Sequence, residues 1–116
     1  MLAIIAPMEK RFARAAAAED IPPGAMTCVE LDGRRILVAN VEGVFYATDD
    51  TCTHEDASLS CGFLDGGLVK CPLHGSRFDV RTGMPMEDPA EEPLRCYAVK
   101  VVDGAVLVAL PRGEMP

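Results

Sequence analysis

Large aromatic side chains are scarce in this sequence, which has no tryptophan, two tyrosines and four phenylalanines among 116 residues. A well-packed core must therefore consist mainly of valine, leucine, isoleucine and alanine, and such a core suits a small β domain. The chain is also too short for two separate cores, so residues 1–116 are expected to form one domain.

Long apolar runs are absent as well. No stretch approaches the roughly 18–20 residues that a membrane-spanning helix needs. The apolar residues 2–6 have no basic segment before them and are too few for a secretory signal. We therefore expect a cytoplasmic protein without a membrane partner, in which residues 1–9 form a loose lead. The five cysteines, an odd number, favour metal binding or buried thiols over a disulfide framework.

Basic residues are outnumbered, with 11 Lys and Arg against 18 Asp and Glu and a formal net charge of −7. Nucleic acids and anionic lipids bind through clustered Lys and Arg, so neither is an expected partner, and a basic protein partner fits better. Four carboxylates flank one cysteine-histidine motif: Asp49, Asp50, Glu55 and Asp56. They are interpreted as charges of a solvated loop, or else as charges that steer a partner toward the site.

Strand and turn signals fill both ends of the chain. Apolar stretches at 27–31, 35–41 and 44–48 are separated by Asp-Gly and Glu-Gly dipeptides, which predicts a β-meander. Stretches at 97–102 and 105–110 flank a second Asp-Gly dipeptide and predict a two-residue hairpin.

The segment before the meander is predicted to be a strand over 11–17. Its alanines have helical propensity, but the Pro-Pro-Gly sequence at 22–24 leaves too few residues for a stable helix. Between the strand-rich ends, residues 49–95 are rich in glycine and proline, with short strands predicted at 68–70 and 77–80. Long irregular segments in a compact domain are usually functional.

Two short motifs in this central segment carry both histidines of the chain. They are Cys52-Thr53-His54 and Cys71-Pro72-Leu73-His74. A single cysteine is usually a small buried side chain, and a single histidine is more often a hydrogen-bonded residue than a ligand. The joint pattern, with each histidine close to a cysteine after an apolar strand, indicates ligation of a metal or a cluster.

The other three cysteines have no histidine beside them. Cys28 and Cys96 lie in predicted strands and are interpreted as ordinary buried thiols. Cys61 lies between the two motifs without a partner at a matching spacing, and its role stays open.

The identity of the metal follows from how the ligands are distributed. Structural zinc sites pair a C-x2-4-C motif with an H-x3-5-H motif, whereas here each loop supplies one cysteine and one histidine. That distribution suits a two-iron cluster in which two histidines replace two thiolates on one iron. A structural zinc-binding module remains a remote alternative.

The run CTHEDASLSCGFLDGGLVKCPLHGSRFDVRTG closely resembles the cluster-binding region of Rieske ferredoxins from bacterial aromatic-ring dioxygenase systems. The likeness continues through EDIPPG and VFYATDDTCTHE on one side and PAEEPLRCYAVKVVDGAVLV on the other, roughly over residues 11–110. It implies an all-β Rieske fold, an antiparallel β-sandwich with a loop-rich cluster-binding subdomain at about 49–95. One [2Fe-2S] cluster per chain is implied as well.

The resemblance also implies roles for individual residues. Cys52 and Cys71 would bind the inner iron, and His54 and His74 the outer, solvent-facing iron. Pro89 matches the loop that covers the cluster from a third side.

Respiratory Rieske proteins differ from this sequence at informative positions. Their loop-linking disulfide cannot form here, because Ala57 and Leu73 replace its two cysteines. Ser76 keeps one hydroxyl donor to the cluster, whereas Phe78 stands where high-potential members have a tyrosine hydroxyl aimed at a cysteine sulfur. Fewer hydrogen bonds to sulfur should lower the reduction potential.

By resemblance the chain is a monomeric one-electron carrier of aromatic hydrocarbon catabolism and not an enzyme. It would accept electrons from a flavin-containing, NADH-dependent reductase and pass them to a terminal Rieske oxygenase. A small docking face is expected from Glu55, Pro72, Leu73 and Gly75. The alternative is a permanently bound small subunit, such as the Rieske-like subunit of assimilatory nitrite reductase.

Overall fold

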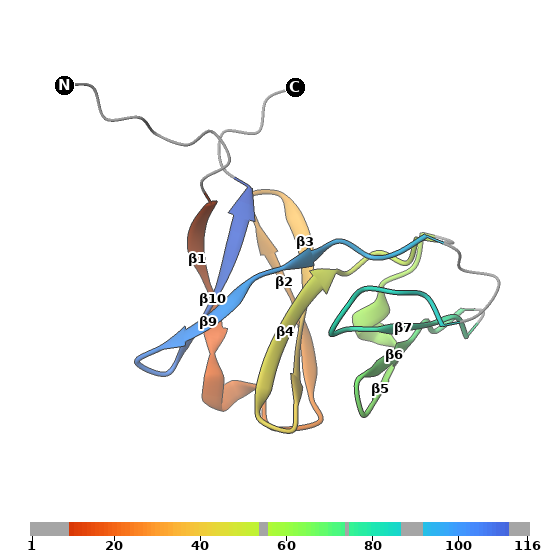
Figure 1. Ribbon diagram of the computed structural model, residues 1–116, viewed down its shortest axis with the longest axis horizontal. Coiled ribbons are helices and arrows are strands. Elements are labelled where there is room, and N and C mark those ends of the chain that lie inside the picture. The colour runs from red at the N-terminus through yellow and green to blue at the C-terminus, as the bar shows by residue number, and fades with distance from the viewer. Residues whose placement is uncertain (1–9, 54–55, 74, 87–91, 112–116) are drawn as a thin grey trace.

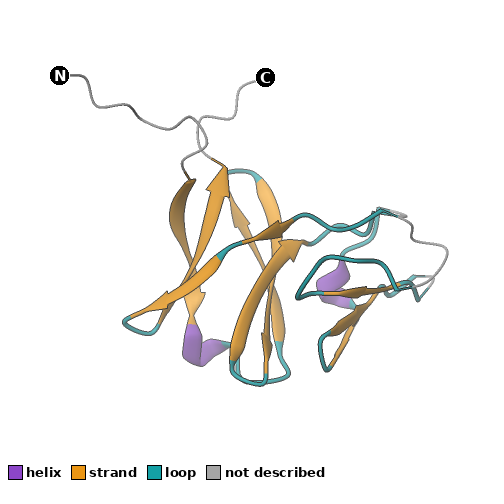
Figure 2. Cartoon of the chain, in the orientation of Figure 1, coloured by secondary structure: helices purple, strands orange, loops and turns teal. Residues whose placement is uncertain are grey.

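The structure, a computed structural model, describes residues 10–53, 56–73, 75–86 and 92–111, so the expected loose lead at 1–9 lies outside it. The described residues form ten strands and two short 3-10 turns, without a helix long and apolar enough to span a membrane (Figure 2). The strands are β1 (Lys10–Ala17), β2 (Met26–Leu31), β3 (Arg34–Val41), β4 (Val44–Asp49), β5 (Phe63–Asp65), β6 (Leu68–Lys70), β7 (Arg77–Asp79), β8 (Cys96–Tyr97), β9 (Val99–Val102) and β10 (Ala105–Pro111). The turns are η1 (Ala18–Asp20) and η2 (Leu59–Cys61).

The first half of the chain forms the predicted meander. Strands β2, β3 and β4 pair antiparallel in chain order, and β8 pairs with the other side of β4. The two turns have φ of 53° and 78° at Asp32 and Gly33, and of 53° and 95° at Glu42 and Gly43. Two successive positive φ angles characterise the tight hairpin turn whose twist matches that of its strands. The predicted three antiparallel strands are confirmed.

The first described strand and the last two form a second sheet of order β1-β10-β9 (Figure 1). The hairpin predicted at Asp103-Gly104 is present, with φ of 51° and 78° at these residues. The first strand predicted at 11–17 is confirmed as β1.

The single strand predicted over 97–102 is wrong, because the chain changes sheets at Ala98. Strand β8 pairs with β4 in the meander sheet, whereas β9 pairs with β10. Tyr97 is buried, and its hydroxyl donates a hydrogen bond of 2.5 Å to the carboxylate of Asp49 at the end of β4. This contact holds β8 against the meander and leaves β9 to cross to the other sheet.

A small antiparallel sheet, β5-β6-β7, lies at one end of the molecule beside β4 and away from β1 (Figure 1). The strand predicted at 68–70 is confirmed, and the strand predicted at 77–80 is confirmed over Arg77–Asp79. Strand β5 is not among the strands predicted from the sequence. Val69 and Phe78 lie opposite each other on its buried face, each with 0% exposure.

Strand β3 is buried on both faces and joins the small sheet to the rest of the fold. Ile36 and Val38 belong to the core cluster between the two larger sheets, whereas Leu37 and Ala39 belong to a second cluster that includes residues of the small sheet. Successive side chains of a strand point to opposite faces, so a strand buried on both sides needs an unbroken apolar run. Residues 36–39 of β3 supply that run.

The small sheet contacts the segment before β8 closely at Gly83. The Leu94 N–H donates a hydrogen bond of 2.7 Å to the Gly83 carbonyl, and Gly83 has a φ of 84°. A Cβ at this position would lie 2.4 Å from the Leu94 oxygen and 2.9 Å from Cys96 Sγ. Glycine is therefore required here for both space and backbone conformation.

Gly83→Ala is expected to lower the free energy of unfolding by about 2–4 kcal/mol, because positive-φ strain and overpacking add together. Gly24→Ala is the matched control, since Gly24 also has a positive φ, 89°, but a Cβ there would meet nothing within 4 Å. The control should lose only about 1–2 kcal/mol, the cost of the strain. Denaturant unfolding measures both losses, and equal values would show that the contact with Leu94 does not limit stability.

Candidate metal centre

The first predicted ligand segment follows β4 and closes into a narrow loop. The Leu59 N–H donates a hydrogen bond of 2.7 Å to the Asp50 carbonyl, and the Cys52 N–H donates one of 2.9 Å to the Ala57 carbonyl. Cys52 therefore lies at the base of the loop, where its backbone is fixed on both sides.

The second segment repeats this arrangement between β6 and β7. The Cys71 N–H donates a hydrogen bond of 2.7 Å to the Ser76 carbonyl, and the Gly75 N–H donates one of 3.2 Å to the Cys71 carbonyl. In both loops the cysteine N–H thus bonds to the carbonyl of the residue five positions later. Two loops of the same design each present one cysteine from their base.

Both cysteine side chains are buried in the same cluster of residues. The exposed fractions of Cys52 and Cys71 are 3% and 1%, and the cluster includes Val69 and Phe78 of the small sheet. The fold therefore brings the two cysteines, which are far apart in sequence, into one water-poor region. That is a suitable environment for thiolate ligands of one metal centre.

Three of the six predicted site residues lie outside the described residues: His54, His74 and Pro89. The structure describes the other three, Cys52, Cys71 and Ser76, and brings both cysteines together. In the part of the chain with described structure, no three His, Cys, Asp or Glu side chains form a group that could hold a metal ion. Both histidines lie outside that part, so their ligation stays a prediction.

The hydroxyl of Ser76 tests whether the site fits a metal–sulfur cluster. Ser76 has 0% exposure, and its Oγ is the only buried side-chain nitrogen or oxygen of the described residues without a hydrogen-bond partner. A buried hydroxyl without a partner is costly and calls for an explanation. A sulfur acceptor beside Cys71 would supply the partner, so the residues present fit a cluster.

The side chain of Asp50 is buried. The interpretation of its carboxylate as a charge of a solvated loop, or as a charge that steers a partner, is therefore wrong. Its carboxylate has 0% exposure and accepts hydrogen bonds from the Ser58 hydroxyl, from the Ser60 N–H at 2.9 Å and from Arg35 Nη2 at 3.1 Å. Burial alone would raise the pKa of Asp50, but the hydrogen bonds from Ser58, Ser60 and Arg35 hold it below its usual value. Ser58 and Ser60 are the sequence signal for a buried carboxylate, but their role can be recognised only in the folded loop.

The remaining cysteines have the character of ordinary thiols. Cys28 is half-buried, and burial together with the nearby Asp50 charge raises the pKa of its thiol. Cys96 is exposed, so its interpretation as a buried thiol is wrong, although partial burial and nearby carboxylates also raise the pKa of its thiol. Cys61 is an exposed free thiol. A raised pKa makes a thiol less reactive and a weaker ligand at neutral pH.

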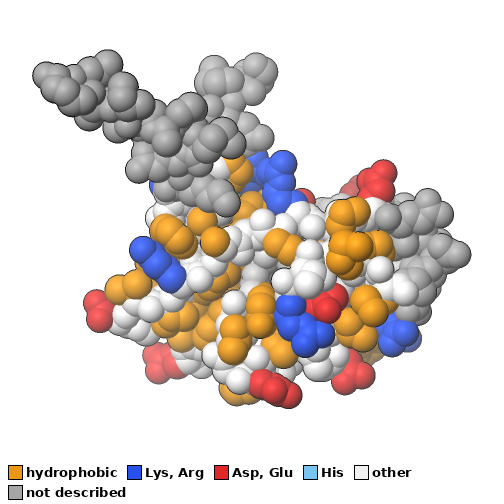
Figure 3. Space-filling model, viewed as in Figure 1, with side chains coloured by type: hydrophobic (Ala, Val, Ile, Leu, Met, Phe, Trp, Pro, Cys, Tyr) orange, Lys and Arg blue, Asp and Glu red, His pale blue; other side chains and the backbone are white. Residues whose placement is uncertain are grey.

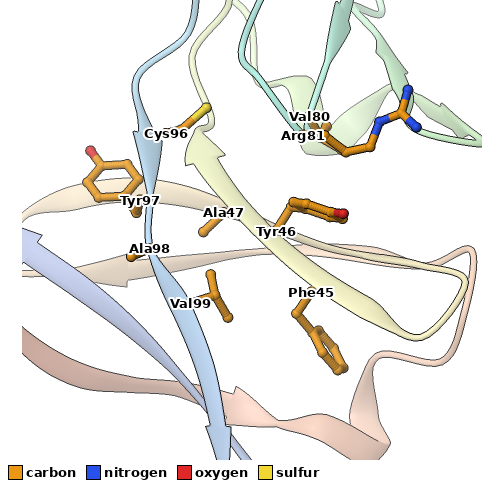
Figure 4. Close-up of a pocket in the computed structure, with 9 residues that line it drawn as sticks. All are labelled: Phe45, Tyr46, Ala47, Val80, Arg81, Cys96, Tyr97, Ala98 and Val99. Atoms are coloured by element: carbon orange, nitrogen blue, oxygen red, sulfur yellow. The ribbon is translucent and has the colours of Figure 1, made fainter.

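An open hollow of about 330 Å³ lies where β4 and β8 approach the turn after β7 (Figure 4). Its lining includes Tyr46 of β4, Arg81 of the turn after β7, and Cys96 and Tyr97 of β8 (Figure 4). None of the three described site residues, Cys52, Cys71 and Ser76, lines it. The hollow is therefore separate from the two buried cysteines.

Comparison with known proteins agrees with this geometry. Residues 11–98 match the family described as "Rieske [2Fe-2S] domain". The biphenyl dioxygenase ferredoxin subunit of Pseudomonas sp. (strain KKS102) is 40% identical over 90% of this chain and 96% of its own length.

Solved structures show the same relationship. The ferredoxin in a complex of reduced oxygenase and oxidised ferredoxin of carbazole 1,9a-dioxygenase is 44% identical, with a TM-score of 0.82 over 89% of this chain and 97% of that one. A putative nitrite reductase (NADPH) small subunit has a TM-score of 0.72 over 84% of this chain and 97% of its own. Its identity is 24%, so that likeness shows the fold alone.

Ser58→Ala is expected to lower the free energy of unfolding by about 1.5–3 kcal/mol, because it removes a hydroxyl that donates to a buried carboxylate. Ser60→Ala is the matched control in the same turn. It removes a hydroxyl that lies 3.0 Å from Ser58 Oγ and keeps the Ser60 N–H bond to Asp50. Its loss should be about 1 kcal/mol or less. Equal losses in thermal unfolding would contradict the role of Ser58 as the main hydroxyl donor to Asp50.

Proposed function

The chain belongs to the Rieske [2Fe-2S] domain family, and from this premise we propose that it is the ferredoxin component of an aromatic-ring dioxygenase system. It carries one electron at a time on a [2Fe-2S] cluster to a terminal oxygenase and is not itself an enzyme. The observation that carries this proposal is that the chain matches ferredoxin components over nearly their whole length. The two buried cysteines on matching loops support it.

In this proposal Cys52 and Cys71 hold the inner iron, and His54 and His74 hold the outer iron. The bound cluster supplies one-electron redox chemistry. Burial of both cysteines keeps water from the thiolates, and the backbone closure of each loop fixes their orientation. Strand β3 contributes to both core clusters, which supports treating residues 1–116 as one domain.

Hydrogen bonding around the site favours a low reduction potential. Ser76 offers one buried hydroxyl. Phe78 is fully buried in the same group of hydrophobic core residues as both cysteines, and its ring offers no hydrogen-bond donor. A donor to sulfur stabilises the reduced state, because reduction increases the negative charge on the sulfur atoms. With one such hydroxyl among the described residues, the cluster gives up its electron more readily, as a donor to an oxygenase should.

The docking face would lie at the second ligand loop. Leu73 is 63% exposed, and Pro72 beside it is exposed too, whereas Glu55 lies outside the described residues. Figure 3 shows hydrophobic side chains at the surface of the end that holds β5–β7, close to charged ones. A small mixed surface suits the weak, transient contact of a shuttle. The electron source would be a flavin-containing, NADH-dependent reductase, and the carrier would act as a monomer in the cytoplasm.

The competing functions lack such support. A permanently bound nitrite reductase subunit shares the fold, but its sequence similarity is much weaker than that of the dioxygenase ferredoxins. A zinc-binding module is disfavoured by the match to the Rieske family, which binds iron and sulfide.

Electron transfer to an oxygenase tests the proposed function directly. The purified protein, reduced chemically under anaerobic conditions, is mixed in a stopped-flow instrument with the oxidised terminal oxygenases of biphenyl and carbazole dioxygenases. We expect reoxidation of the carrier, seen in its visible spectrum, with at least one oxygenase. Transfer to neither, together with elution of the native protein as part of a larger reductase in gel filtration, would contradict a free carrier.

Phe78→Tyr is expected to raise the reduction potential. If the added hydroxyl donates to a cysteine sulfur, a differential hydrogen bond of roughly 1–2 kcal/mol corresponds to about 40–90 mV for one electron. Ser76→Ala is the opposite control, because it removes the buried hydroxyl and should lower the potential by a similar amount. Voltammetry measures both shifts. An unchanged or lower potential in Phe78→Tyr, with the cluster intact, would show that this side chain points away from the metal centre.

A further inference from the structure

A buried negative charge stands directly beside the first ligand loop. Asp50 lies two residues before Cys52, so their Cα atoms are at most about 7 Å apart. The side chain of Asp50 has 0% exposure. Water and salt screen such a buried charge far less than a surface charge, so its field extends to the neighbouring site.

Asp50 also connects three parts of the fold. Its N–H donates a hydrogen bond of 3.1 Å to the Arg35 carbonyl of β3. Its own carbonyl accepts from Leu59 at 2.7 Å, which closes the ligand loop. Its carboxylate accepts from the Ser58 hydroxyl and from the Ser60 N–H, which holds the turn at η2. One residue therefore fixes the start of the loop, its end and its attachment to the sheet.

The charge of Asp50 is only partly balanced. Among the described residues, Arg35 is the cation that contacts it, at 3.1 Å, and the Arg35 side chain is 55% exposed. Solvent therefore screens the positive charge more than the negative one. Ser58 and Ser60 are neutral, and the pKa of the neighbouring Cys28 thiol is raised, which keeps that thiol neutral. The net field from this group at the metal centre is negative.

We propose that Asp50 is a positioning residue for the cluster: it holds the loop that presents Cys52, and its buried negative charge keeps the reduction potential low. The proposal rests on the proposed function in one respect, that Cys52 is a cluster ligand. An electron added to the cluster is repelled by a fixed negative charge nearby, so the reduced state is disfavoured. Arg35 has the opposite effect, weakened by its exposure.

Two substitutions that remove charges of opposite sign distinguish an effect of charge on the reduction potential from an effect of packing. Asp50→Asn keeps the shape of the side chain and removes the negative charge, whereas Arg35→Gln removes the balancing positive charge. Both substitutions weaken the same group of hydrogen bonds. A merely structural role would therefore shift the reduction potential of both variants in the same direction. The matched control is Asp103→Asn, which removes one negative charge in the β9–β10 turn, where φ is 51° and asparagine is tolerated.

The readouts are the reduction potential by voltammetry and the rate at which a chelator removes iron. In Asp50→Asn we expect the ratio of reduced to oxidised protein at a fixed electrode potential to rise threefold to tenfold, which is about 30–60 mV for one electron. In Arg35→Gln the ratio should fall about twofold to threefold, and in Asp103→Asn it should stay unchanged. Iron loss should be at least threefold faster in Asp50→Asn than in the control.

Opposite shifts in the two variants, with no shift in the control, support the proposal. Shifts of the potential in the same direction in both variants would overturn it. So would an unchanged potential in Asp50→Asn with full iron content. If Asp50→Asn does not fold, Arg35→Gln alone decides the question, since a potential that stays level or rises contradicts the charge effect. A wild-type protein without iron and sulfide would instead overturn the proposed function.

Discussion

Cys52 and Cys71 are buried in one hydrophobic core against the small sheet, and the rest of the site depends on this constraint. Two thiolates can share a metal centre only if the two loops that carry them, which strands β5 and β6 separate in the sequence, place their cysteines close together. Strand β3 makes this possible because one of its faces packs on the sandwich core and the other on the cysteine cluster. The sandwich thereby acts as the rigid base of the metal centre.

Polar groups around this dry region set its chemistry. The Ser76 hydroxyl is the one buried donor of the described residues without a partner in the protein, and it lies on the second ligand loop. Asp50 is the buried carboxylate of the first loop, fully supplied with hydrogen bonds. Phe78 adds bulk without a donor. The single donor stabilises the reduced state only modestly and the negative charge opposes reduction, so the balance suits a carrier that must give up its electron.

The sequence predicts those parts of the fold that depend on local geometry. The Asp-Gly and Glu-Gly turns require positive φ at two successive residues, and this requirement is visible in the dipeptides themselves. The sheet change at Ala98 could not be predicted, because it depends on a hydrogen bond between Tyr97 and Asp49, which are distant in the sequence. The burial of Asp50 escaped prediction for the same reason. The cysteine pair was predictable because each cysteine has a histidine nearby, but the convergence of the two loops required the structure.

The central claim, that two cysteines and the two histidines share a [2Fe-2S] cluster, is tested most directly by labelling histidine. The chain contains only two histidines, so protein grown with ¹⁵N-histidine carries ring labels at His54 and His74 alone. Electron–nuclear double resonance of the reduced protein should then show strong coupling to two ¹⁵N nuclei, and to one in His54→Ala or His74→Ala if a cluster is retained. A reduced cluster without ¹⁵N coupling in the wild-type protein would contradict the account.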